Sequence, residues 1–308
     1  MPPTALRPRR QQRPNSLAFL FASLLCAATV TTVAGQAGRR NAPASDRGAL
    51  LNVVAAREGA ATGPLTAKDI SFYAGGIEQT VLTFSRDPGP ARIVLLVDNS
   101  LSLRTDVPKL QQVAREFAYE IYEGDQMLIV GYDEQAEIVT DWTDDAKKVE
   151  ATLGALRKKG EPHLFDALSA VLEQALVPVS GNRKRVVVLI GDGLDRGSKT
   201  KFKDILGELQ SADVALYALQ LLDRTNGAHR RDQPKPSEVV RQLAEGTGGR
   251  VLPLDDPRAA AKSVCDELRN NRYLLGYVPT ISYADTRRLL LLGPPGVSVR
   301  AKAMQPAK

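Results

Sequence analysis

Apolar runs of strand length alternate along the middle of the chain with segments of helical periodicity. The runs predict buried strands at 92–97, 126–132, 185–190 and 214–221. Between and after them, apolar positions recur every three or four residues and predict helices at 108–121, 144–156, 164–175, 202–209, 237–245 and 257–270. This alternation predicts an α/β fold, a doubly wound and mainly parallel sheet with helices on both faces.

Patterns typical of strands flank this α/β region at both ends. Residues 49–56 predict a strand, and residues 70–84 predict a hairpin that turns at Gly75-Gly76. Pro88-Gly89-Pro90 marks a boundary, and residues 272–279 and 296–303 predict two late strands. We therefore expect a leader and short β-rich segment over 38–90, an α/β domain over 91–270 and a C-terminal β extension over 271–308. Because an isolated hairpin is marginal in water, the two β extensions should pack together outside the main sheet.

The first 37 residues have the pattern of a targeting segment. Four arginines precede an apolar stretch, Leu17 to Gly35, which ends in small residues. This order is typical of a cleaved signal peptide over 1–37, with cleavage near Ala37, and predicts a secreted, periplasmic or cell-envelope protein. The alternative is an uncleaved membrane anchor, because the apolar stretch is near the lower length limit for spanning a bilayer.

Composition narrows the possible functions. The chain has 308 residues, 43% of them hydrophobic and 25% charged, as in a soluble globular protein. Its net charge of +6 includes four arginines from the first 13 residues, so it does not indicate a nucleic-acid-binding surface. Two cysteines and two histidines exclude a disulfide framework and any metal site that needs three histidines.

Oxygen-bearing side chains follow two of the predicted buried strands. Asp98, Ser100 and Ser102 form a D-x-S-x-S motif after the first strand, and Asp192 follows the strand at 185–190. The carboxyl ends of parallel strands share one edge of a sheet, so these groups can face one crevice. They are hard donors suited to Mg²⁺, Mn²⁺ or Ca²⁺. Two carboxylates in one crevice repel each other, so we expect a bound cation or a basic neighbour between them.

With these motifs, residues 91–270 resemble the von Willebrand factor type A domain and its metal-ion-dependent adhesion site. The segments VVLIGDGLDRGS, LFDALSAVLEQA and RYLLGYVP resemble a bacterial secreted group of such domains. The resemblance implies strand order 3-2-1-4-5-6 with one antiparallel edge strand. It also implies that Ser100 and Ser102 bind the cation directly, that Asp98 and Asp192 bind it largely through water, and that a partner's carboxylate completes the metal shell.

One position departs from the family pattern. Pro162 stands where the family carries a threonine, four residues before the acid Asp166. Proline has no side-chain ligand atom, so the site loses an oxygen, which water could replace on Mg²⁺. Glu161, His163 and Asp166 are possible accessory ligands. The alternative is a purely structural role, in which these polar residues only cap helices and order loops.

Three functional hypotheses follow. The first is a non-enzymatic adhesion module whose divalent cation holds an acidic residue of a protein partner. The second is a scaffold or assembly domain with a degenerate, metal-independent site. The third and most remote is a metal-assisted hydrolase, because the sequence has no HExxH, GxSxG or Walker motif and no obvious general base.

Overall fold

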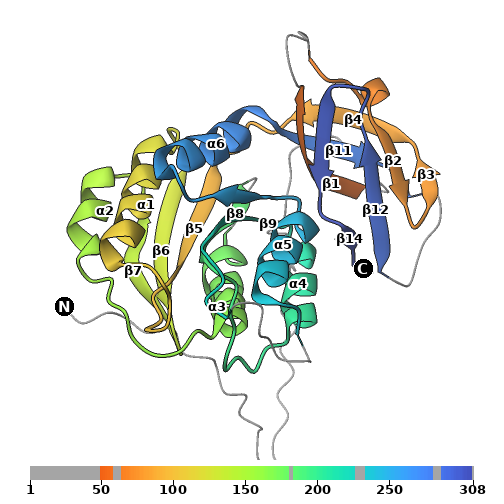
Figure 1. Cartoon of the computed structure of the whole chain (residues 1–308). Coiled ribbons are helices and arrows are strands. Elements are labelled where there is room, and N and C mark those ends of the chain that lie inside the picture. The colour runs from red at the N-terminus through yellow and green to blue at the C-terminus, as the bar shows by residue number, and fades with distance from the viewer. Residues whose placement is uncertain (1–48, 58–63, 180–182, 226–232, 280–285, 307–308) are drawn as a thin grey trace, which may run out of the picture.

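The chain forms a helix-covered sheet and a separate lobe of strands, as the computed structural model shows (Figure 1). The structure describes residues 49–57, 64–179, 183–225, 233–279 and 286–306, so the predicted signal peptide over 1–37 and its cleavage site near Ala37 lie outside it. Among the described helices, none has the length and apolar character needed to span a membrane.

The main sheet has six strands in the order β10-β9-β8-β5-β6-β7. Five run parallel, and only the edge strand β7 is antiparallel to its neighbour. Counted along the chain this is order 3-2-1-4-5-6, so the predicted fold class and the topology implied by the family resemblance are confirmed. The strands are β5 (Ala91–Asp98), β6 (Gln126–Tyr132), β7 (Ala136–Thr143), β8 (Lys184–Gly191), β9 (Val214–Gln220) and β10 (Val251–Pro253).

Helices cover both faces of this sheet, which explains the uninterrupted apolar runs of its central strands. Residues 93, 95 and 97 of β5 pack with α1, α2 and α6, while residues 94 and 96 pack with α3, α4 and α5. The helices are α1 (Val107–Glu120), α2 (Ala146–Leu153), α3 (Leu164–Val171), α4 (Phe202–Ser211), α5 (Pro236–Gly246) and α6 (Pro257–Asn270). A π-helical turn, η2 (Leu172–Leu176), extends α3.

The remaining strands form the β lobe, which joins the two ends of the described chain. One sheet has the order β13-β1-β11-β4, in which C-terminal and N-terminal strands alternate; the other has the order β14-β12-β2-β3, in which a C-terminal pair of strands joins an N-terminal pair. Their shared core includes Phe72 and Tyr277, whose rings meet edge to face at 4.7 Å. The strands are β1 (Ala49–Arg57), β2 (Ser71–Ala74), β3 (Ile77–Gln79), β4 (Val81–Arg86), β11 (Arg272–Tyr277), β12 (Arg287–Leu292), β13 (Val297–Ala301) and β14 (Met304–Gln305); a short 3-10 turn, η1 (Ala67–Asp69), precedes β2.

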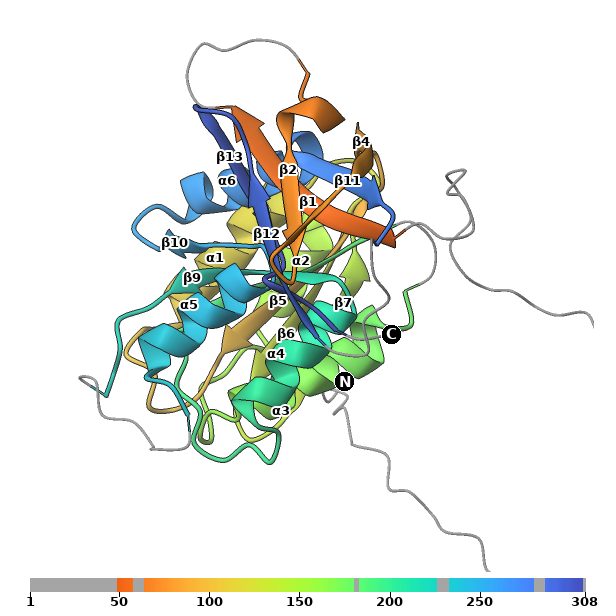
Figure 2. The same ribbon diagram turned by 90° about the vertical axis from the view of Figure 1, so that its right-hand side faces the viewer.

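The β lobe lies against the amino edge of the main sheet, on the side where α4 and α5 end (Figure 2). Thr247, just after α5, forms a β-bridge with Lys302, and the N–H of Ala303 donates to the carbonyl of Gly246. The Lys302 ammonium donates to the carbonyl of Gln210 at the end of α4. The opposite, carboxyl edge of the main sheet is therefore left free of the β lobe.

Gly248 should be a sensitive point of this contact. Its φ is +85°, and a Cβ there would lie 2.8 Å from the backbone carbon of Ala301 in β13. We expect Gly248→Ala to lower the free energy of unfolding by about 1–3 kcal/mol, because the strained backbone and the close approach cannot both be relieved. Urea unfolding followed by circular dichroism measures the change.

Gly207 in α4 provides the matched control. A Cβ at Gly207 would have nothing within 4 Å, so Gly207→Ala should stabilise the protein by about 0.5–1 kcal/mol. Equal effects of the two substitutions would contradict the proposed role of Gly248.

Candidate functional site

The candidate site is a crevice at the carboxyl edge of the main sheet, between the ends of β5 and β8. Asp98 is the last residue of β5, and Asp192 directly follows β8, its parallel neighbour. Strand order reverses at β5, because the chain proceeds to β6 on one side and β8 and β9 lie on the other. Ligands of doubly wound sheets are generally found at such a point. Asp98, Ser100 and Asp192 are all buried here, and Ser102 is half-buried.

A guanidinium group fills the centre of this crevice. Arg224, four residues beyond the end of β9, has a side chain only 3% exposed. Its Nε lies 2.6 Å from Oδ2 of Asp192, and its Nη2 lies 2.8 Å from Oδ1 of the same carboxylate. Nη2 also donates to Asp98, and Nη1 donates to the hydroxyls of Ser100 and Ser102, both at 2.8 Å. All four residues predicted as metal ligands therefore bind one arginine.

The loops around the guanidinium are ordered by the same two carboxylates. Oδ1 of Asp98 accepts hydrogen bonds from the backbone N–H and the hydroxyl of Ser100, at 2.9 and 2.5 Å. Oδ1 of Asp192 accepts from the N–H of Leu194 at 3.1 Å, and its Oδ2 accepts from the N–H of Arg224 at 3.2 Å. Each carboxylate thus holds its own loop in place and also binds the arginine.

Burial and charge act in opposite directions on these groups. Burial raises the pKa of Asp98, and the charge of Arg224 and the hydrogen bonds from Ser100 offset only part of that rise. Burial by itself would lower the pKa of Arg224, but the hydrogen bonds to Asp192 and the charge of Asp98 raise it above its ordinary value. Arg224 therefore stays protonated. Asp98 is the group in the crevice whose ionised form is destabilised by burial.

Tyr132 extends this buried polar region at the end of β6. Its hydroxyl is fully buried and has no hydrogen-bond partner among the described residues. Burial raises the pKa of Tyr132, and the negative charge of Asp98 raises it further, so the phenol stays neutral.

The arrangement does not fit a resident divalent cation. The donor set is chemically suitable, but the guanidinium of Arg224 engages both carboxylates and both hydroxyls. Pro162 is buried and offers no side-chain oxygen. Within the described ranges, no group of three or more His, Cys, Asp or Glu side chains is placed to hold a metal.

The possible accessory ligands make other contacts. Glu161 pairs with Arg196 at 3.1 Å. His163 is the residue before α3, and its ring lies against Gly197, where a Cβ would come within 1.9 Å of Nε2. Asp166 accepts from the N–H groups of residues 199 and 200; although burial alone would raise its pKa, these bonds lower it. The three side chains order the loop after β8 and do not join the four crevice residues.

Arg224 is the residue that sequence reasoning did not identify. The expected charge balance called for a cation or a basic neighbour, and the structure supplies a basic neighbour. A signal for it exists: Arg224 follows β9, whose end lies at the same sheet edge as those of β5 and β8. The polar loop that carries it contains other arginines, so the signal does not single out this one.

Comparisons with known proteins address the sheet domain. Residues 93–194 match the model of the von Willebrand factor type A domain. No curated protein matches the chain.

Several solved structures align with part of this chain. A von Willebrand factor type A protein from Catenulispora acidiphila is 10% identical, with a TM-score of 0.46, and the alignment covers 77% of this chain and 72% of that one. An aerotolerance-related membrane protein from Bacteroides fragilis is 16% identical with a TM-score of 0.44, covering 58% and 98% of the two chains. Proximal thread matrix protein 1 from the mussel byssus is 16% identical with a TM-score of 0.48, covering 60% and 49%.

The matched residues run from β5 through η2 and β8 to the loop that carries Asp192, and thus include every residue that Arg224 binds. Over residues 93–194, the helix-covered sheet of this protein matches the von Willebrand factor type A domain.

Proposed function

We propose that this protein is a non-enzymatic, metal-independent protein-interaction module of the cell envelope or the secreted fraction. Its von Willebrand factor type A domain would bind a protein partner at the loops of the carboxyl edge. Arg224 would serve there as a built-in cation in place of a divalent metal. Of the three hypotheses from sequence, this is the scaffold or assembly domain with a degenerate adhesion site.

The main support for the proposal is that a single side chain binds all four polar residues of the crevice. The Arg224 guanidinium donates to both carboxylates and both hydroxyls that a metal would need. A planar fork that binds Asp192 through two nitrogens gives strong, directional, charge-assisted bonds. A divalent cation could enter only by expelling this buried arginine and leaving it without its partners.

The arrangement of the reactive groups in the described part of the chain also supports a non-enzymatic role. The two crevice carboxylates are held by Arg224 and cannot act as free bases. The one cysteine in the described part of the chain, Cys265, is buried, and burial raises the pKa of its thiol, so it is a poor nucleophile. His163 lies against the loop after β8 and contacts neither carboxylate of the crevice.

Two leucines mark the surface that we propose as the binding face. Leu101, between the two site serines, is 65% exposed, and Leu222, two residues before Arg224, is 87% exposed. Both project from loops of the carboxyl edge, opposite the β lobe. Exposed Arg104 lies near Leu101 in the same loop and can meet an acidic residue of the partner. The proposed partner is therefore a protein with an apolar contact and an adjacent acidic group.

Removal of the guanidinium should destabilise the fold strongly. We expect Arg224→Met to lower the free energy of unfolding at pH 7.5 by about 3–5 kcal/mol, since it leaves two buried carboxylates unpaired. The control is Arg196→Met at the same edge, whose half-exposed pair with Glu161 should contribute at most about 1 kcal/mol. Denaturant unfolding at fixed salt compares the two variants, and equal small losses would argue against a central role for Arg224.

The loss in Arg224→Met should also depend on pH. Burial already raises the pKa of Asp98 in the folded protein, and loss of Arg224 should raise it further. A carboxyl with a raised folded-state pKa binds more protons folded than unfolded, so stability falls as pH rises from the ordinary value of about 3.9 through the raised one. The loss of stability should therefore be smaller at pH 5 than at pH 7.5. A loss that grows on acidification would contradict this assignment.

A divalent metal should change the melting temperature only when Arg224 is absent. For the wild-type protein, we expect the same melting temperature in EDTA and in millimolar Mg²⁺ or Mn²⁺. For Arg224→Ala, which opens space between two carboxylates and two hydroxyls, Mn²⁺ should raise the melting temperature and EDTA should reverse the rise. Calorimetric titration of Mn²⁺ into both proteins provides the direct measurement. Saturable binding to the wild type that Asp98→Ala abolishes would instead favour the cation-dependent adhesion module.

The binding face can be tested in cells that produce the protein. A photo-crosslinking residue in place of Leu101 or Leu222 should capture one common partner, in EDTA as well as in Mg²⁺. The same residue in place of Tyr119, exposed near the end of α1 at the opposite edge, is the control and should not capture it. Capture that EDTA abolishes would overturn metal independence, and capture from position 119 alone would place the interaction elsewhere.

A further inference from the structure

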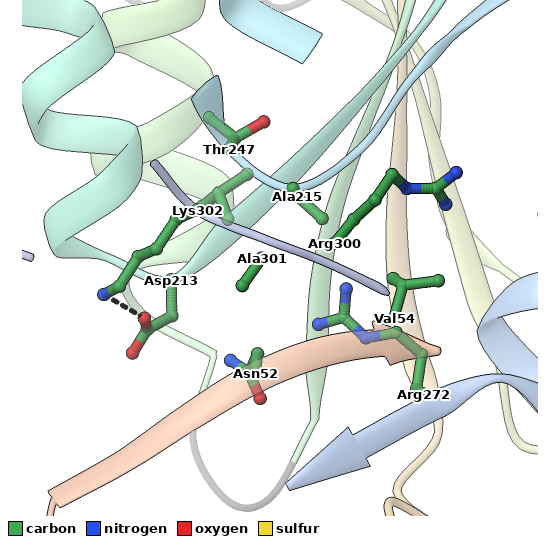
Figure 3. Close-up of a pocket in the computed structure, with 11 residues that line it drawn as sticks. Asn52, Val54, Asp213, Ala215, Thr247, Arg272, Arg300, Ala301 and Lys302 are labelled. Carbon is green, nitrogen blue, oxygen red and sulfur yellow. Dashed lines mark hydrogen bonds and ion pairs between the residues drawn. The ribbon is translucent and has the colours of Figure 1, made fainter. Parts of the chain in front are cut away.

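A second cluster of charged groups lies far from the crevice, in the seam between the β lobe and the main sheet (Figure 3). A cavity of about 10 Å³ is lined there by strands of the β lobe and by the turns before β9 and after α5. This is room for about one particle the size of a water molecule. Its polar lining comes from Asn52, Asp213, Thr247, Arg272, Arg300 and Lys302.

Two arginines in this lining have unused donors. Arg272, at the start of β11, is only 4% exposed, and Figure 3 shows its guanidinium directed toward Ala301 across the seam. The Nε of Arg272 and the Nε of Arg300 are both buried, and neither has a hydrogen-bond acceptor in the described part of the chain. Buried N–H groups of charged side chains are rarely left without an acceptor, so an acceptor belongs in this space.

The carboxylates around the seam are already engaged by other cations. Glu267 receives Arg300 at 2.5 Å and Arg250 at 3.1 Å, so one negative charge faces two positive ones. Asp213 pairs with Lys302 at 2.5 Å, as the dashed line in Figure 3 marks.

Asp87 is a further buried carboxylate beside Arg272. Its backbone N–H donates to the carbonyl of Arg272, while its carboxylate accepts from the N–H of Gly89. Arg272 and Arg300 both line the cavity, and they pair in register with the same residue, Val54 of β1, from the two strands on either side of it. Arg272 thus adds a positive charge for which the described residues provide no carboxylate partner.

We propose that this cavity is a binding site for one small inorganic anion of the size of chloride, held by Arg272 and the Nε of Arg300. An anion supplies the missing acceptor for both donors and offsets the excess positive charge, which a neutral water does only in part. Because its ligands come from β11 and β13 of the β lobe and its wall from the main sheet, the anion ties the two parts together. The site does not depend on the function proposed for the crevice.

Thermal unfolding of the full chain tests the site with chloride as the probe. We expect the melting temperature of the wild type to be about 3 °C higher in sodium chloride than in sodium gluconate at equal ionic strength, with a saturable dependence on chloride. Arg272→Met should lose this difference. The control Arg115→Met, which removes an exposed arginine paired with Glu150 on α1 and α2, should retain it.

Wild-type crystals soaked in bromide provide a second measurement that needs no variant. The proposal requires an anomalous bromide peak at hydrogen-bonding distance from Nε of Arg272, which would support it even if Arg272→Met fails to fold. A melting temperature that is the same in both salts, or a crystal with only water beside Arg272, would overturn it. Retention of the chloride effect in a folded Arg272→Met variant would likewise overturn it.

Discussion

Two buried carboxylates at the ends of neighbouring parallel strands impose the main constraint on this protein. Asp98 and Asp192 are carried to one crevice by strands whose register is fixed by an uninterrupted ladder. Their mutual repulsion and the loss of hydration would favour protonation or unfolding unless a cation lies between them. Arg224 is that cation, and all five N–H donors of its guanidinium are used within the crevice.

A tethered guanidinium differs from a dissolved metal ion in its physical consequences. Its local concentration is set by the chain, so the neutralisation of the crevice does not vary with the ionic composition of the surroundings. The guanidinium carries one charge where Mg²⁺ carries two, so the raised pKa of Asp98 accords with incomplete compensation. The arginine also fixes the loop after β9 to the loops after β5 and β8, which makes the carboxyl edge one connected surface.

The β lobe gives that surface a defined orientation. Strands from before and after the main sheet lie side by side in it, so the two flanking segments of the chain build the lobe together. The lobe packs on the amino edge of the main sheet through Thr247, Lys302 and Ala303. Loops at the carboxyl edge are therefore the ones available to a partner, and the charged seam at the other edge is internal.

The sequence by itself determined the architecture and the four crevice residues. Apolar periodicity is local information, so the strand at 126–132 and the helix at 257–270 could be predicted with both ends correct. The D-x-S-x-S motif and Asp192 were found because each directly follows a strand. A positive group in the crevice could also be predicted, because two carboxylates in one crevice repel each other unless a cation or a basic side chain lies between them.

Only the tertiary structure decided which positive group that is. Arg224 is 126 residues from Asp98 and 32 from Asp192, and its loop carries no periodic pattern that fixes where a side chain points. The same holds for the seam, where Arg272 and Arg300 lie on either side of Val54 because β11 and β13 both pair with β1. Ion pairing between distant residues depends on distances of a few ångströms that hydrophobic periodicity does not encode, because that pattern records only which face of an element is buried.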